Sequence, residues 1–282
     1  MKKIARALLF ACLAGCTPVD APSYPQEVEP AGEVVDAFGM LYPEAENTSW
    51  DFERGSYIAR FTLSSGPAYA WFNTGGDWLL SAREQSRWQL SGELSAAFSG
   101  SAYADWDLKK VNLLERLRMG ALYIFSVAED GRHASIYYSR LGDLVKVDNA
   151  SEDAVQHPVT IPQEIFRTVD SLFNKSEIID MWRGELSINV AVMDDNDVCR
   201  FAAFSDGYDW LCSIWDIERD VIPENVRDAF GSSEYRDNPV SRTQLLQNDD
   251  EVMYLFHFTD NNNKRRIIGI NEKGFLQYII TY

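Results

Sequence analysis

Histidine and cysteine are scarce in this sequence, which holds three histidines and four cysteines among its 282 residues. None of the histidines has a cysteine, aspartate or glutamate at metal-ligand spacing, and the motifs H-E-x-x-H, C-x-x-C and G-x-S-x-G do not occur. Without a positioned base, serine and threonine hydroxyls lack the activation that nucleophilic catalysis requires. A carboxylate pair could serve a glycosidase, but 43 acidic residues produce such pairs by chance. We therefore predict a protein that is not an enzyme, with no cofactor and no metal site.

Calcium is the one cation for which the sequence offers suitable residue types. Asp194-Asp195-Asn196-Asp197 could supply oxygen ligands from one loop. The run lacks the D-x-D-x-D-G spacing and the distal glutamate of a calcium loop. Aspartate and asparagine are also common in ordinary hairpin turns. Calcium binding stays open beside the simpler interpretation as a turn.

Positive charge is also in short supply. The chain has 26 basic and 43 acidic residues, a net charge of −17. Residues 1–15 hold three basic and no acidic residues, so their removal leaves a net charge of −20. Such a charge argues against nucleic acid and anionic lipid surfaces as partners.

The N-terminus carries a sorting signal. Three basic residues precede an apolar run at 7–14 that is too short to span a bilayer, and the run ends in Leu13-Ala14-Gly15-Cys16. This pattern resembles a bacterial lipoprotein signal peptide. The resemblance implies cleavage of residues 1–15, a diacylglycerol on the Cys16 thiol and an acyl chain such as palmitate on its amine. Thr17, in place of aspartate, implies sorting to the outer membrane, on the periplasmic side or at the cell surface.

Cysteine then remains as a thiol at two positions of the mature chain, Cys199 and Cys212. They flank the Asp206-Gly207 turn nearly symmetrically, which predicts neighbouring strands. In an oxidising envelope we expect a disulfide between them. The alternative is a pair of buried thiols.

The sequence of residues 70–81, AWFNTGGDWLLS, recurs without a gap at residues 202–213 as AAFSDGYDWLCS. Each copy is typical of a hairpin, with an alternating strand, a turn and a second strand. Apolar residues at helical spacing precede both copies, at 34–42 and 165–173, and Trp50 matches Trp182. The near-constant offset continues beyond the hairpin to Tyr123, which matches Tyr254. An offset kept over this much of the chain indicates a tandem duplication.

The domain organisation follows from this repeat. After the signal peptide, residues 16–30 are proline-rich and predict an extended tether. Residues 31–150 and 158–282 are the two domains, joined by a polar linker at 148–157. Each domain is predicted to hold two units of one helix followed by a three-stranded antiparallel meander. The fold class is therefore α+β.

Several packing residues point to a known family. They are Ala37-Phe38, Tyr42-Pro43, Trp50, Tyr57-x-Ala-x-Phe61, Ala70-x-Phe72 and Gly76-x-Trp78. They resemble the PepSY-like, β-lactamase-inhibitor-protein-like envelope proteins of Bacteroidetes, over about 30–150 and more loosely over 160–282. The resemblance implies helices on one face of antiparallel sheets and a free concave face, which the inhibitors use to bind their enzyme. No functional residue transfers from the family.

Strand alternation predicts which residues lie on that free face. If Ala70 and Phe72 face the helix, their neighbours on the strand point to the opposite side. The predicted face then carries Arg60, Tyr69, Trp71 and Tyr137, residue types that are frequent in binding hot spots. The alternative is that this face packs against the other domain.

We therefore expect a lipid-anchored envelope protein that binds or inhibits another protein through an open sheet face. The alternative is a carbohydrate-binding or structural component of an outer-membrane assembly. A carbohydrate surface could use Trp88, Trp106 and Trp215, which have no counterpart in the other copy. The partner is then an envelope protein or a glycan.

Overall fold

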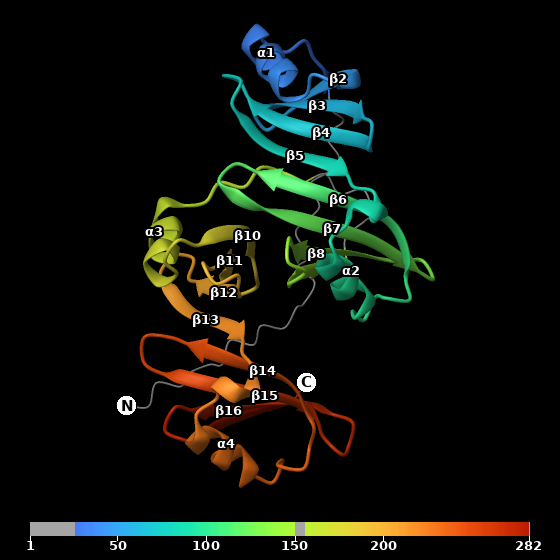
Figure 1. The fold of residues 1–282 in the computed structure, drawn as a ribbon. Helices are drawn as coiled ribbons and strands as arrows, with labels where there is room; N and C mark the ends of the chain where they lie inside the picture. Colours follow the sequence, from blue (N-terminus) through green and yellow to red (C-terminus); the bar gives the residue numbers. More distant parts are fainter. Residues whose placement is uncertain (1–25, 150–155, 282) are drawn as a thin grey trace. The chain divides into compact units, whose positions relative to one another are not determined.

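A computed structural model describes residues 26–149 and 156–281 (Figure 1). The chain divides into two compact units, residues 1–159 and 160–282. The signal peptide, Cys16 and most of the tether lie outside the described residues. No helix in the described part of the chain is long and apolar enough to cross a membrane.

The first unit is one nine-stranded sheet in which each strand pairs with the next in sequence. Its elements are β1 (Gln26–Glu27), α1 (Gly32–Leu41), β2 (Glu46–Glu53), β3 (Ser56–Leu63), β4 (Gly66–Asn73), β5 (Trp78–Glu84), the 3₁₀ turn η1 (Arg87–Gln89), α2 (Gly92–Ser99), β6 (Asp107–Arg116), β7 (Met119–Glu129), β8 (Arg132–Ser139) and β9 (Leu144–Asp148).

The second unit repeats this order as an eight-stranded sheet, again with sequential antiparallel neighbours. Its elements are α3 (Gln163–Leu172), β10 (Glu177–Arg183), β11 (Ile188–Met193), β12 (Cys199–Phe204), β13 (Trp210–Asp216), the 3₁₀ turn η2 (Arg219–Val221), α4 (Glu224–Gly231), β14 (Val240–Gln247), β15 (Val252–Thr259), β16 (Arg265–Asn271) and β17 (Leu276–Thr281).

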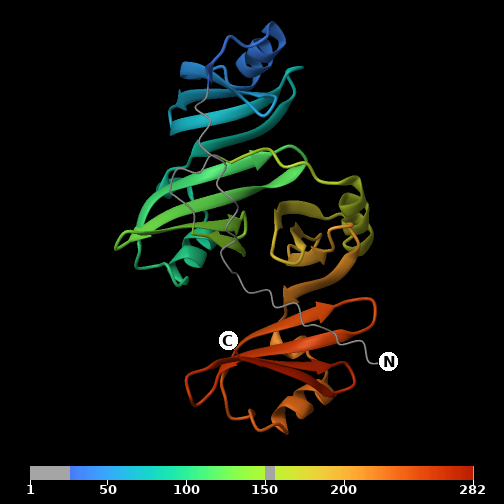
Figure 2. The same ribbon diagram turned by 180° about the vertical axis from the view of Figure 1, so that it is seen from behind.

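Both helices of the first unit lie on one side of its sheet, as the resemblance implies (Figures 1 and 2). Phe38 of α1 packs with Ala70 of β4, and Leu94 of α2 packs with Phe125 of β7. Pairing through alternate residues of β5 and β6 connects Ala70 to Phe125 on one face. The α+β class with helices on one side of antiparallel sheets is therefore confirmed.

The second unit has the same arrangement. Val226 of α4 packs with Phe256 of β15. At the end of α3, the ring of Phe173 lies 5.6 Å from the guanidinium of Arg200 on β12. Strand pairing places Arg200 on the same face as Phe256. The helices of this unit therefore also share one side of their sheet.

The predicted number of strands is wrong, because four strands rather than three follow each helix. The missed strands are β2, β6, β10 and β14, the first after each helix. In β2 the residues 46–49 are all polar or charged and exposed, so the period-two apolar pattern that marks a strand is missing. The end of the predicted tether is also part of the sheet, since residues 26–27 form β1 and pair with β2.

Each of the two duplicated units is itself built from two shorter repeats. In the turn after β4, Asn73 Oδ1 accepts hydrogen bonds of 2.9 Å from the backbone N–H groups of Gly75 and Asp77. The same two bonds, from the residues two and four positions later, recur in all four helix-plus-strand repeats. Their acceptors are Asn73, Ser139, Ser205 and Asn271. Each unit is therefore itself a pair of similar halves.

These turns also contact the helix of their own repeat. Gly76 and Gly142 have φ angles of 89° and 88°. A Cβ at these positions would lie 2.8 Å from the Glu33 carbonyl oxygen and 2.9 Å from that of Glu93, in the first turns of α1 and α2. Glycine is thus required both by the left-handed backbone and by the close approach.

Trp182 differs from Trp50 although the sequence aligns them. Trp50 packs on Phe38 with ring centroids 5.3 Å apart, on the helix side. Trp182 pairs with Asn189 on the opposite face and lies near Phe201. Ala70 pairs with the residue 11 positions before it, Ala59, whereas the aligned Ala202 pairs with the residue 12 positions before it, Val190. The connection from β11 to β12 therefore holds one more residue, so β10 and β11 are one residue out of step with the aligned sequence of the first unit. A one-residue shift moves every side chain of a strand to the other face.

The predicted disulfide is also wrong: Cys199 and Cys212 are both buried thiols. They do lie on the neighbouring strands β12 and β13. Cys212 pairs with Ala203, however, four residues along the strand from Cys199. Four residues of strand span roughly 13 Å, whereas the Cα atoms of a disulfide lie within about 7 Å. Burial raises the pKa of the Cys212 thiol to about 11, which makes it a poor nucleophile.

Candidate functional site

The four residues predicted for binding all lie on the sheet face of the first unit opposite α1 and α2. Arg60 pairs directly with Tyr69 across β3 and β4. Tyr69 and Trp71 alternate along β4 with alanine and phenylalanine side chains of the helix-side core. Tyr137 lies between two residues of the α2 core on β8. We call this surface the sheet face.

The sheet face is more buried than the sequence led us to expect. Trp71 is 1% exposed and Tyr137 is 4% exposed, while Tyr69 is half-buried. The guanidinium of Arg60 is more open, and its Nε donates a 2.7 Å hydrogen bond to Asp51 Oδ2. The expectation of an uncovered face therefore does not hold for Trp71 and Tyr137.

Part of this cover is a segment of the chain itself, Gln156 and His157 at the end of the predicted linker. The backbone N–H of Gln156 donates to the Tyr69 hydroxyl at 2.9 Å. Its side-chain Nε2 donates to the Tyr137 hydroxyl at 3.1 Å. The His157 ring meets Trp71 edge-on, with centroids 5.2 Å apart. Three of the four predicted residues thus converge on two residues that no motif in the sequence indicates.

The two tyrosines lie in different electrostatic settings. Burial raises the pKa of Tyr69, and the Gln156 N–H and the Arg60 charge oppose this rise. The Lys146 ammonium lies 4.4 Å from the centroid of the Tyr137 ring, a distance typical of a cation–π contact. The raised pKa keeps the Tyr69 hydroxyl neutral at physiological pH, and both tyrosine hydroxyls accept hydrogen bonds from Gln156.

A pocket of about 390 Å³, lined by both polar and apolar residues, opens on the sheet face beside Gln156. Its floor includes Ser126 of β7 and Ser135 of β8, which pair directly across the two strands. They are 2% and 9% exposed. Within the described residues neither hydroxyl makes a side-chain hydrogen bond. The residues that line the pocket are Arg60, Phe61, Pro67, Ala68, Tyr69, Ala82, Glu84, Lys110, Asn112, Ile124, Ser126, Ser135 and Gln156.

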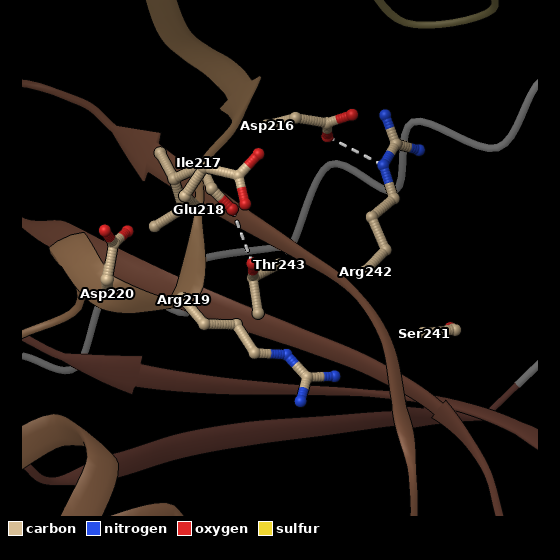
Figure 3. Close-up of a pocket in the computed structure, with 8 residues that line it drawn as sticks. All are labelled: Asp216, Ile217, Glu218, Arg219, Asp220, Ser241, Arg242 and Thr243. Atoms are coloured by element: carbon tan, nitrogen blue, oxygen red, sulfur yellow. Dashed lines mark hydrogen bonds and ion pairs between the residues drawn. The ribbon is translucent and has the colours of Figure 1, made fainter.

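A second depression, of about 560 Å³, lies in the second unit between the end of β13, η2 and the start of β14 (Figure 3). Arg242 Nε donates to Asp216 Oδ1 at 2.7 Å, and the Thr243 hydroxyl donates to the Ile217 carbonyl at 2.6 Å. The side chains of Arg242 and Asp216 are at least half exposed. These charges already pair with each other in water, so this depression is a weaker candidate than the pocket of the first unit.

The acidic run at 194–197 forms a turn whose first carboxylate is occupied. Asp194 Oδ1 accepts from the backbone N–H groups of Asn196 and Val198, and Oδ2 accepts from Arg200 Nε at 2.7 Å. These hydrogen bonds together hold the pKa of Asp194 below its usual value, although burial opposes them. In the described part of the chain, no three His, Cys, Asp or Glu residues are grouped to hold a metal ion.

The three tryptophans without a counterpart have separate environments. Trp106 packs edge-on against Tyr103, and Trp215 lies under the guanidinium of Arg200 at 4.1 Å. Trp88, in η1, is 96% exposed. They therefore do not form one aromatic platform.

One hydrogen bond that recurs in both units was not predicted from the sequence. The Arg87 guanidinium donates to the Leu108 carbonyl, and Arg219 donates to the Val240 carbonyl at the corresponding place in the second unit. Each bond ties the 3₁₀ turn to the strand that follows the helix. The arginines at matching positions of the two units were a sequence signal for this contact. No sequence signal indicated the roles of Gln156 and Ser126.

The chain is similar to solved structures from Bacteroides. A DUF2874 family protein from Bacteroides ovatus is 27% identical, with a TM-score of 0.42, over 44% of this chain and 91% of that protein. A BLIP-like protein from Bacteroides fragilis is 26% identical, with a TM-score of 0.43, over 47% and 96%. A protein from Bacteroides eggerthii, proposed to be periplasmic, is 17% identical, with a TM-score of 0.41, over 43% and 90%. No protein-family model and no curated protein matches the chain.

The similarity to BLIP-like proteins of Bacteroides agrees with the resemblance drawn from the sequence. Each similar structure matches slightly less than half of this chain and at least nine tenths of its own length. That share corresponds to about one of the two units. With TM-scores below 0.5, these likenesses support no conclusion about function.

Proposed function

We propose that this chain is a non-enzymatic, protein-binding lipoprotein of the outer membrane that contacts its partner through the sheet face of the first unit. The observation that carries the proposal is the pocket floor, where the buried hydroxyls of Ser126 and Ser135 line open space without a side-chain partner among the described residues. Whether the bound partner is also inhibited depends on what the partner does.

Unsatisfied polar groups favour a partner that supplies hydrogen bonds. A buried polar group without a partner costs about 1–3 kcal/mol. That cost applies to the Trp71 indole N–H, which is buried without a partner among the described residues, whereas Ser126 and Ser135 line the pocket and offer a partner two hydroxyls that can donate or accept. Arg60 and Tyr69 at the pocket edge are residue types that often dominate binding energy. A pocket with a mixed polar and apolar lining and such residues beside it suits a protein surface, which offers both kinds of contact.

The lipid anchor is the second part of the proposal and rests on the Leu13-Ala14-Gly15-Cys16 motif. A single acyl chain binds a membrane weakly, whereas two or more hold a protein stably. Lipidation of both the thiol and the amine of Cys16 therefore gives a permanent anchor. The proline-rich residues that follow separate the first unit from the membrane.

In-cell photo-crosslinking tests the binding face in the full lipoprotein. A photoreactive amino acid replaces Thr62, which is two residues beyond Arg60 and pairs with Pro67 at the pocket. The matched control position is Asp36, which is exposed on α1. We expect one or a few discrete protein adducts from position 62 and none from position 36. Ser126→Val should then reduce the adduct by about tenfold, the loss of about 1.4 kcal/mol of binding free energy.

Two results would contradict the proposal. Equal adducts from both positions would mean that the sheet face is not the binding surface. An adduct with glycan and not with protein would favour the carbohydrate-binding alternative. Mass spectrometry of the purified adduct separates these results.

A further inference from the structure

The sheet face already holds an extended peptide segment, which is the chain's own Gln156–His157. Gln156 donates two hydrogen bonds, one from its backbone to Tyr69 and one from its side chain to Tyr137. His157 adds an edge contact to Trp71. The two tyrosine hydroxyls that receive these bonds come from different strands, β4 and β8. The face is therefore built to hold a peptide that runs across its strands.

The fit of this segment is incomplete. Within the described residues, Trp71 Nε1 and His157 Nδ1 are both buried without a hydrogen-bond partner. A buried polar group that lacks a hydrogen bond destabilises a protein by more free energy than a typical intramolecular hydrogen bond contributes to stability. The contact between Gln156–His157 and the face is consequently weak for the area that it covers.

We propose that Gln156–His157 is an internal occupant of the binding face, and that the partner displaces it with an extended polar peptide segment of its own. This inference rests on the proposed function. The incoming segment makes the same two donations to Tyr69 and Tyr137. It adds an acceptor for the Trp71 indole N–H, and a polar side chain that reaches Ser126 and Ser135. The exchange is favourable because the partner satisfies groups that the internal segment leaves unsatisfied.

Fluorine NMR of the mature chain labelled with 5-fluorotryptophan tests the displacement directly. The Trp71 resonance is assigned by its loss in Trp71→Phe, and its solvent exposure is measured from the H₂O/D₂O isotope shift. The double variant Gln156→Gly and His157→Gly removes the side-chain donation to Tyr137 and the ring contact with Trp71, and leaves the backbone N–H of residue 156 as the one remaining donor to Tyr69. The matched control is Thr160→Gly, an exposed position in the same connection. We expect the isotope shift of Trp71 to rise at least threefold in the double variant and to stay unchanged in the control.

A synthetic peptide then tests whether the face accepts a separate chain. The probe is acetylated and amidated Gln-His-Pro-Val, the sequence of residues 156–159. At about millimolar concentration, comparable to the effective concentration of a tethered segment, it should return the Trp71 isotope shift of the double variant to the parent value. A scrambled peptide should not. Tyr69→Phe, which keeps the ring and removes the acceptor hydroxyl, should weaken this binding several-fold.

An unchanged Trp71 isotope shift in the double variant would overturn the inference, because the internal segment would then not be what covers the ring. An exposed Trp71 that does not respond to the peptide would also overturn it. Tyr69→Phe provides an independent check if the double variant misfolds, since amide exchange of Gln156, whose N–H donates to the Tyr69 hydroxyl, should become several-fold faster. These results are distinct from the crosslinking result. Adducts from position 62 with an immobile internal segment would keep the proposed function and reject only the displacement.

Discussion

His257 makes the second unit sensitive to acid. It lies on β15 opposite Arg242 of β14, and its Nε2 is buried without a hydrogen-bond partner among the described residues. Burial, and next the Arg242 charge, lower its pKa to about 4, against the opposing effect of Asp216. The folded pKa lies below the unfolded value of about 6.5. The neutral form is thus favoured by folding, so stability is complete above about pH 6.5 and is lost as the pH falls towards 4.

The size of this loss follows from the two pKa values. The full shift from about 6.5 to about 4 corresponds to about 3.4 kcal/mol at about 1.36 kcal/mol per pKa unit, and about 2.5 kcal/mol of it is lost between pH 7.5 and pH 4.5. His257 is half-buried, so solvent screening reduces the effect to about 1–1.5 kcal/mol. His257→Leu should remove this acid-specific loss. It should leave the unit at least as stable at pH 7.5, because it also removes the unsatisfied Nε2.

Methionine oxidation by peroxide in a urea series reports on each unit separately. Met253 and Met193 are buried in the second unit and Met119 is buried in the first, whereas Met40 is 84% exposed and marks full reactivity. The protection of Met253 should fall between pH 7.5 and 4.5 by the amount above in the parent and much less in His257→Leu. His133→Leu, at an exposed histidine, is the matched control and should behave as the parent. Equal acid losses in the parent and His257→Leu would refute the reasoning.

Three further predictions concern the turns, the thiols and the anchor. Gly142→Ala should destabilise the first unit by about 2–4 kcal/mol, from the left-handed backbone and the clash with α2. Gly131→Ala, at a φ of 76° with no neighbour within 4 Å, should cost about 1 kcal/mol; equal losses would exclude the clash. Titration of denatured, unreduced protein should find Cys199 and Cys212 both reactive, and a disulfide between them would disprove the strand register. Cys16→Ala should leave the protein in the aqueous phase of a detergent partition, whereas retention in detergent would contradict lipid anchoring.

The alternation of side chains along strands and the internal repeat together predicted most of the fold. The apolar residues at every second position of β3 and β4 fixed their helix-side face, since a strand must bury one side. Ala70 and Phe72 do pack towards α1. The positions of Tyr69 and Trp71 on the opposite face followed from the same parity. Strands without this pattern, such as the polar β2, could not be found, because their place is set by pairing with a neighbour.

The sequence did not predict the register in which neighbouring strands pair. One additional residue in the turn after β11 reverses the direction of Trp182. An offset of four residues between paired strands separates Cys199 from Cys212. Neither the extra turn residue nor the offset between the paired strands can be derived from the sequence before the length of each turn is known. The contact of Gln156 with Tyr69 was likewise hidden, because it joins residues 87 positions apart and no local pattern constrains such a contact.

The two units have similar helix sides and different sheet faces, and this contrast bears on where binding occurs. The pocket floor of the first unit is the pair Ser126 and Ser135. At the corresponding place in the second unit, next to Arg242, the pair is His257 and Ile267. Packing against the helices constrains one side of each sheet, whereas the other side is left to specify a partner. The hydroxyl pair occurs in the first unit and is replaced in the second, and this difference is why we propose the first unit, rather than the second, as the binding unit. The second unit shares this architecture, but the depression beside its Arg242 is lined by the charged residues of η2 and the ends of β13 and β14 instead.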